Sequence, residues 1–187
     1  MNSIKAEYRK SIYDKSHDFL NIIIDGQSLD MLLDKCMPNR MINGLIPTLL
    51  FRMERDVENE IVWDRILPRL KHKVNCPILM CPDDLDFSCT IITVEVEYTG
   101  LTYIWKNFAF DRTKNVYQNP EWIGRNKEFI TGGISFEFEM KAYNDFVQTF
   151  QNQYVKEQEE WTEKYPEIKY ALPLSLIHIS EPTRQEA

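Results

Sequence analysis

The sequence predicts an α+β fold, in which one domain holds a mostly antiparallel sheet, flanking helices and a long C-terminal amphipathic helix. Three observations predict it. Residues 89–111 alternate apolar and polar side chains on both sides of a Thr-Gly turn, which is typical of a β-hairpin. Residues 141–165 repeat aromatic and apolar side chains with a helical period. The strand patterns gather in the middle of the chain with helical patterns around them, which favours α+β over a repeating βαβ chain.

The N-terminal elements follow from short local patterns. We expect the charged residues 1–15 to be loose or helical. Residues 19–25 alternate and then run apolar until an Asp-Gly pair closes them, which predicts a strand ending in a turn. Ser28 is placed to cap a short helix over residues 29–36, whose leucines recur every three or four positions. Residues 41–50 contain a glycine and a proline, so a short strand and an irregular crossing are both open.

The middle of the chain predicts a helix followed by several strands. Residues 54–67 have a helical pattern with acids in the first turn, where the helix dipole favours them, and Pro68 ends it. The side chains expected on its buried face are Val57, Ile61, Ile66 and Leu67. Residues 76–82 predict a short buried strand, residues 112–127 a long polar and aromatic loop, and residues 134–140 another half-buried strand.

The hairpin and the last helix each have one face expected in the core. The hairpin turns at Thr99-Gly100. On its first strand, core-facing and solvent-facing side chains are expected to alternate: Ile92, Val94 and Val96 face the core, and Thr93, Glu95 and Glu97 face solvent. We expect Trp105 on its second strand to be a core residue. The buried stripe of the last helix is expected to hold Tyr143, Phe146, Val147, Phe150 and Tyr154.

The overall composition argues against two classes of partner. The chain has a net charge of −7, or −6 without residues 174–187, and so disfavours nucleic acid, whose binding depends on neutralising phosphates. It has no apolar run near the roughly 20 residues that a membrane span requires, and no signal-peptide pattern at its start. Its four scattered cysteines do not resemble a secreted disulfide framework, so we expect a cytoplasmic protein with free thiols.

The last residues of the chain have a different character. Residues 174–184 can be reverse-translated into eleven codons that resemble a transposase-based sequencing adapter. We therefore expect residues 174–187 to be a non-native tail. A genuine unstructured terminus is the alternative. The remaining residues, 1–173, have the length of one domain with a substantial core.

Residues 75–89 concentrate the side chains that could carry chemistry, with three cysteines and three aspartates in 15 positions. A zinc site needs four converging ligands, and the spacings C-x4-C and C-x7-C lack the close C-x-x-C pair that usually supplies two of them. A calcium-binding loop requires a glycine at its turn and a glutamate at its end, and neither follows the aspartates here. A structural interpretation has the cysteines packing as small apolar groups while the aspartates cap a turn. The ligands expected if zinc binds are Cys81, Asp84, Asp86 and Cys89.

Residues 81–97 have the sequence CPDDLDFSCTIITVEVE, and a Trp and a Phe follow after the turn. This order resembles a group of uncharacterised bacterial proteins, over about residues 18–150 of the chain. In many relatives a cysteine-rich knuckle resembles C-P-x-C-G-D-x-x-C, whereas this chain has Asp84 in place of the second cysteine. Because zinc prefers a thiolate ligand to a carboxylate, the replacement of this cysteine by Asp84 weakens the case for an inherited metal site. The resemblance implies a fold and no established activity.

Other side chains are weaker candidates. Glu95 and Glu97 share one face of the hairpin, where paired carboxylates can do acid/base work but are usually solvated. Trp122, in a polar loop, is the better surface candidate among the aromatic residues. His17 and His72 have no partner motif, so no catalytic constellation emerges.

We therefore expect an acidic protein that binds another protein, needs no cofactor and is not an enzyme. A bacterial immunity protein that neutralises a basic toxin domain is one form of this expectation, which rests on analogy alone. The alternative is a zinc-binding module or a metal-dependent enzyme that uses residues 81–89.

Overall fold

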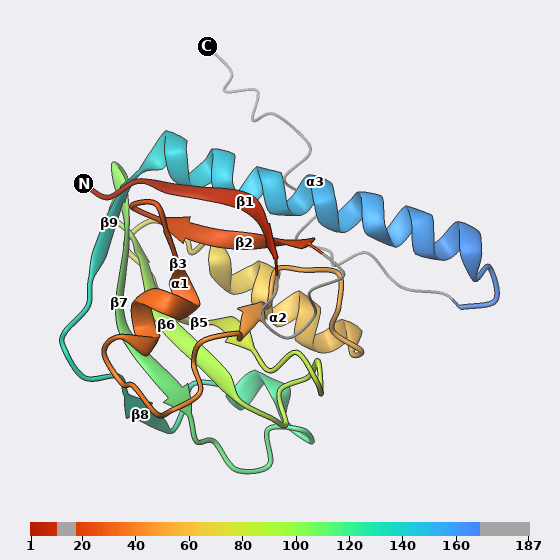
Figure 1. Cartoon of the computed structure of the whole chain (residues 1–187), viewed down its shortest axis with the longest axis horizontal. Helices are drawn as coiled ribbons and strands as arrows, with labels where there is room; N and C mark the ends of the chain where they lie inside the picture. Colours follow the sequence, from red (N-terminus) through yellow and green to blue (C-terminus); the bar gives the residue numbers. More distant parts are fainter. Residues whose placement is uncertain (11–17, 169–187) are drawn as a thin grey trace.

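The computed structural model describes residues 1–10 and 18–168, and Figure 1 shows how their elements are arranged. They form a single α+β body of antiparallel sheets with three α-helices, as the sequence predicts. The expected tail at residues 174–187 lies outside the described residues, as do residues 11–15 of the expected loose N-terminus. Among the described helices, none is both long enough and apolar enough to cross a membrane.

The elements form two sheets and three helices. The smaller sheet holds β1 (Ile4–Lys10), β2 (Asp18–Ile24) and β3 (Gln27–Ser28) in that order. The larger sheet holds β4 (Ile46–Pro47), β5 (Lys73–Met80), β6 (Ile91–Tyr98), β7 (Thr102–Asp111) and β8 (Lys127–Phe129) in that order, and β9 (Phe136–Glu139) also pairs with β7. The helices are α1 (Leu29–Asp34), α2 (Asp56–Ile66) and α3 (Met140–Lys164), with a short 3-10 helix, η1 (Pro120–Trp122).

The predicted hairpin is the centre of the larger sheet. Strands β6 and β7 pair antiparallel with Val96 opposite Trp105, and the Thr99 N–H donates to the Thr102 carbonyl at 3.0 Å across the turn. Gly100 has a φ of +101°, a left-handed conformation that glycine adopts without a steric penalty. The prediction of a hairpin that turns at Thr99-Gly100 is therefore confirmed.

The two faces of this hairpin differ less than the sequence predicts. Val94 and Val96 are buried as expected, but Thr93 is fully buried as well, and its hydroxyl donates to the Ala109 carbonyl at 3.4 Å. A shift of register between Thr93 and Glu95 interrupts the strict alternation at this point. The solvent-facing side chains of this strand therefore begin only at Glu95.

Residues 4–10 correct the expectation of a loose or helical N-terminus, because they form strand β1. This strand pairs antiparallel with β2 over seven residue pairs, beginning with Ile4 opposite Ile24. The alternation of Ile4, Ala6 and Tyr8 is a strand signal that the charged residues between them obscure. Helix α3 packs along β1, so the N-terminal strand lies beside the C-terminal helix (Figure 1).

Helix α2 forms where the sequence predicts it but buries a different face. Val57 is 42% exposed, and only Ile66 of the four expected inward side chains is fully buried. The residues that α2 does bury are Glu58, Asn59, Val62, Trp63 and Ile66. The predicted face was wrong because an acid in the first turn of a helix is normally solvated. Glu58 instead points into the core, so the buried face of α2 is the one that contains Glu58.

The predicted aromatic stripe of α3 is confirmed. All five members are buried: Tyr143, Phe146, Val147, Phe150 and Tyr154. Trp105 lies against this stripe, and its indole Nε1–H donates to the Tyr143 hydroxyl at 3.0 Å. The Tyr143 hydroxyl donates in turn to the Ile66 carbonyl at 2.8 Å. This buried chain of hydrogen bonds joins β7, α3 and α2.

Candidate metal centre

The segment between β5 and β6, residues 81–90, is here called the knuckle loop. Its two ends are tied together, because the Cys81 N–H donates to the Thr90 carbonyl at 3.0 Å and extends the pairing of β5 and β6 by one step. Leu85 turns the chain in the middle with a φ of +53°. The Phe87 side chain is 1% exposed and packs into the core. The loop therefore closes as a short arch that is anchored by one aromatic side chain.

A buried carboxylate holds the middle of the knuckle loop. Glu58 has no exposed surface, and its Oε2 accepts a hydrogen bond from the Phe87 N–H at 3.0 Å while its Oε1 accepts one from Arg55 at 2.6 Å. Burial raises the pKa of the Glu58 carboxyl, and the hydrogen bond from Phe87 and the charge of Arg55 oppose that shift. The Glu54 N–H also donates to the Leu85 carbonyl at 3.2 Å. Sequence reasoning missed Glu58, because nothing in the pattern distinguishes it from a solvated acid.

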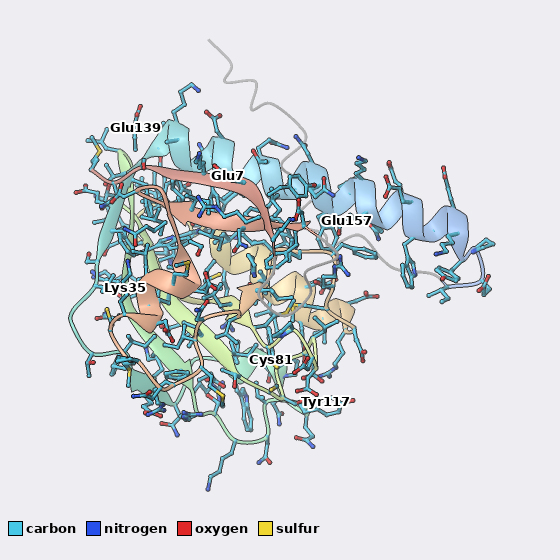
Figure 2. All side chains as sticks on the ribbon, viewed as in Figure 1. Glu7, Lys35, Cys81, Tyr117, Glu139 and Glu157 are labelled. Atoms are coloured by element: carbon cyan, nitrogen blue, oxygen red, sulfur yellow. The ribbon has the colours of Figure 1, made fainter. Side chains whose placement is uncertain are left out.

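Three side chains of the knuckle loop converge. The Sγ atoms of Cys81 and Cys89 and a carboxylate oxygen of Asp84 all lie within 4.8 Å of one another. Cys81, labelled in Figure 2, follows directly on β5, and Cys89 lies on the returning side of the arch. Sulfur ligands in a tetrahedral zinc site are about 3.8 Å apart, so the group needs only a small contraction to hold such an ion.

The fourth expected ligand, Asp86, is not part of this group. Its Oδ1 accepts hydrogen bonds from the backbone N–H of Ser88 at 2.7 Å and from the Ser88 hydroxyl at 2.6 Å. It therefore closes a local turn, which is the role that the structural interpretation of the sequence gives to the aspartates.

The other two cysteines lie elsewhere. Cys76 is buried in β5, where its Sγ lies 3.3 Å from the Pro77 carbonyl oxygen, and burial raises the pKa of its thiol to about 12. Cys36 follows α1, and its Sγ lies 3.7 Å from the Leu32 carbonyl oxygen. Cys76 is thus a packing group, whereas both cysteines of the knuckle loop are only half-buried.

The environment of Cys89 favours the neutral thiol. Burial raises the pKa of Cys89 to about 12, and hydrogen bonds to Asp84 and Cys81 add to the shift. A divalent cation would reverse this preference, because coordination stabilises the thiolate directly. A cation can therefore bind to this group only if thiol protons are released.

The remaining candidate residues lie outside the knuckle loop. Glu97 accepts a hydrogen bond from the Lys106 amine at 3.0 Å, which lowers the pKa of Glu97, and Glu95 lies 3.6 Å from the same amine. Trp122 is half-buried in η1, and the guanidinium carbon of Arg125 lies 4.8 Å from the centre of its ring. Binding roles for Glu95, Glu97 and Trp122 stay predictions.

Comparison of the chain with models of known protein families, with curated proteins and with solved structures finds no match in any of the three. The resemblance to a group of bacterial proteins therefore stays a prediction. Among the described residues, the converging side chains of Cys81, Asp84 and Cys89 are the arrangement that bears most directly on function.

Proposed function

We propose that the protein binds a divalent metal ion, with zinc as the principal candidate, through Cys81, Asp84 and Cys89. The observation that supports this function is the convergence of two thiols and one carboxylate within 4.8 Å. Zinc accepts sulfur and carboxylate oxygen ligands in a tetrahedral arrangement. Calcium and magnesium prefer oxygen ligands, so the two sulfurs favour zinc over either of them.

Three protein ligands leave one position of a tetrahedral shell for water or for an atom of a bound molecule. Structural zinc sites use four protein ligands, whereas catalytic sites keep such a position open. The Asp84 side chain is exposed, so solvent reaches this side of the group. A zinc ion held here would supply a Lewis acid to whatever molecule entered that position.

The knuckle loop is held in place by contacts that do not involve the three ligands. The Glu58 carboxylate holds the Phe87 N–H, and the Phe87 side chain packs into the core. A site whose ligands are positioned by the surrounding fold loses less conformational freedom when its ligand binds. We therefore expect metal removal to loosen the loop rather than to unfold the whole chain, unlike the behaviour of a zinc finger.

Metal analysis of the purified protein tests this function. After incubation with zinc and removal of excess metal by gel filtration, native mass spectrometry is expected to show about one zinc ion per chain. Cobalt(II) in place of zinc is expected to add the near-ultraviolet absorption that thiolate coordination produces.

Variants of single ligands assign the site. Cys89→Ser and Asp84→Asn are each expected to raise the Kd for zinc by at least about tenfold. Cys36→Ser and Asp86→Asn are the matched controls, because they change the same residue types outside the converging group, and we expect both to bind zinc as the wild type does. Unchanged zinc affinity in Cys89→Ser would contradict the proposed ligands.

The expectation of a protein partner, such as a basic toxin domain, stays a prediction. Its candidate acids Glu95 and Glu97 share a sheet face with Lys73 and Lys106, which form ion pairs with them. This face therefore offers little net acidic charge to a basic partner, and metal binding is the function that the geometry supports best.

A further inference from the structure

A concavity with basic side chains lies apart from the knuckle loop. It has a volume of about 540 Å³ and forms between the end of α2, the first half of β5 and residues 121–127. Its charged lining residues are Arg65, Glu121, Arg125 and Lys127. We call it the Arg65 pocket. Its volume falls within the range of small-molecule sites, roughly 300–1,000 Å³.

Arg65 is fixed in this pocket by hydrogen bonds to backbone carbonyls. Its Nη1 donates to the carbonyls of Asn75 and Ile123, each at 3.0 Å, and its Nη2 donates to the Glu121 carbonyl at 2.9 Å. These three bonds use three of the five N–H donors of the guanidinium, and none of the three is to a carboxylate. Burial lowers the pKa of Arg65 and the charge of Arg125 acts in the same direction, while the carboxylates of Asp64 and Glu121 oppose that shift.

The other two cations of the pocket are also held by uncharged groups. The Lys127 amine donates to the side-chain oxygen of Asn75 at 3.0 Å, and Arg125 lies over the ring of Trp122. In the part of the chain that the structure describes, none of the three cations forms an ion pair, whereas Arg112 pairs with Glu128 at 2.8 Å. Glu121 is the one acid in the lining, so the pocket carries an excess of positive charge on an otherwise acidic protein.

The pocket is formed by a segment that is pressed against β5. Gly124 has a φ of +83°, and a Cβ built on it would lie 2.9 Å from the Cβ of Asn75. The Gly124 N–H also donates to the Asp111 carboxylate at 2.9 Å, which fixes the segment to the end of β7. The cations are therefore presented from a positioned backbone and do not depend on a loose loop.

We propose that the Arg65 pocket binds the phosphate group of a small phosphorylated molecule. A phosphate monoester is doubly charged near neutral pH and accepts several charge-assisted hydrogen bonds, which matches two guanidinium groups and one amine. The volume of the pocket leaves room for the rest of a small molecule beside the phosphate. This proposal is independent of the metal site, since no lining residue of the pocket belongs to the knuckle loop.

Titration of the full chain, freed of metal, with inorganic phosphate and with glycerol 3-phosphate tests the proposal. Amide chemical shifts are followed by NMR at constant ionic strength, with sodium chloride as the reference salt. We expect saturable shifts concentrated at residues 65, 74–75 and 121–127, and tighter binding of glycerol 3-phosphate than of inorganic phosphate. Shifts that sodium chloride reproduces, or that spread evenly over the surface, would overturn the proposal.

Variants separate this pocket from general attraction of anions. The double variant Arg125→Gln/Lys127→Gln is expected to raise the Kd for glycerol 3-phosphate by about tenfold or more. Lys114→Gln removes a positive charge from an exposed position in the same loop, and we expect it to leave that Kd unchanged. Glu121→Gln, which removes the one acid of the lining, is expected to lower the Kd. The single variant Lys127→Gln, which removes one charge as Lys114→Gln does, is expected to raise that Kd, and equal effects of the two single variants would show that only overall charge matters and would contradict a site.

Discussion

The backbone N–H of Phe87 donates a 3.0 Å hydrogen bond to the carboxylate of Glu58, which has no exposed surface. The bond spans 29 positions of the sequence and ties the knuckle loop to α2. Arg55 donates to the other carboxylate oxygen at 2.6 Å and so partly neutralises the buried charge. A loop of mainly polar residues therefore keeps one conformation beside the converging cysteines.

Removal of this carboxylate is expected to destabilise the protein. Glu58→Ala leaves the Phe87 N–H buried without an acceptor and Arg55 without its partner, which together should cost about 2 kcal/mol or more of unfolding free energy. Urea denaturation measures the loss. Glu60→Ala, at a half-exposed position of the same helix, is the control and should stay within about 0.5 kcal/mol of the wild type.

The pH dependence of stability gives a second test of Glu58. Burial raises its pKa above the ordinary value of 4.5, so the folded protein binds this proton more readily than the unfolded chain does. The corresponding stability is complete below the unfolded pKa and is lost as the pH rises through the raised folded pKa. The unfolding free energy of the wild type minus that of Glu58→Gln is therefore expected to fall between pH ~4.5 and neutrality. A difference that stayed constant across this range would show that the pKa is not raised.

The buried hydroxyl of Tyr143 should be equally important to stability. Tyr143→Phe leaves the Trp105 indole N–H without its acceptor and the Ile66 carbonyl without its donor, so we expect a loss of about 2–4 kcal/mol. Guanidinium denaturation followed by tryptophan fluorescence measures it. Tyr117→Phe, on a side chain that is 51% exposed, should change the unfolding free energy by less than about 0.5 kcal/mol.

Two glycines with nearly the same φ separate the cost of a left-handed backbone from the cost of steric crowding. Gly26 has a φ of +81° and open space where a Cβ would lie, whereas a Cβ at Gly124 would meet Asn75 at 2.9 Å. Gly26→Ala should therefore cost about 1 kcal/mol for the left-handed conformation alone. Gly124→Ala should cost about 2–3 kcal/mol, because Asn75 must also move. Thermal unfolding of both variants compares them, and equal losses would mean that residues 121–127 are not pressed against β5.

The hairpin and the stripe of α3 could be predicted because local patterns determine them. The alternation of Val94 and Val96 with Glu95 and Glu97 and the helical spacing of Tyr143 and Phe146 match what the structure shows, and the alternation fails only at the buried Thr93. Strand β1 was not predicted, since charged residues obscure its alternation and its pairing with β2, the next strand along the chain, supplies much of its stabilisation. Pairing with a neighbouring strand overrides the local preference of a charged sequence.

The buried face of α2 could not be predicted from its pattern, since a tertiary contact decides it. Val62 has no exposed surface, while Val57, which the pattern assigns to the core, is 42% exposed. Val62→Ala should therefore lower the unfolding free energy by about 2 kcal/mol, and Val57→Ala by less than about 0.5 kcal/mol. Urea denaturation measures both variants. Comparable losses of unfolding free energy would support the buried face that the sequence predicts.

The candidate sites were predictable only in part. Three of the four expected ligands, Cys81, Asp84 and Cys89, converge because antiparallel pairing brings the two ends of the knuckle loop together. Asp86 is instead hydrogen-bonded to Ser88 in a local turn. The Arg65 pocket has no sequence signal, because Arg65 meets the Glu121 backbone across 56 positions. Such a contact depends on the path of the whole chain and leaves no local motif.

Helix α3 begins at Met140, directly after β9 ends at Glu139, so no spacer separates the strand from the helix. An insertion of one residue in β9 would move its side chains to the opposite face of the sheet and would also turn the helix by about 100° about its own axis. Both errors would remove aromatic residues from the core at once. Length variation should therefore be tolerated least at this junction.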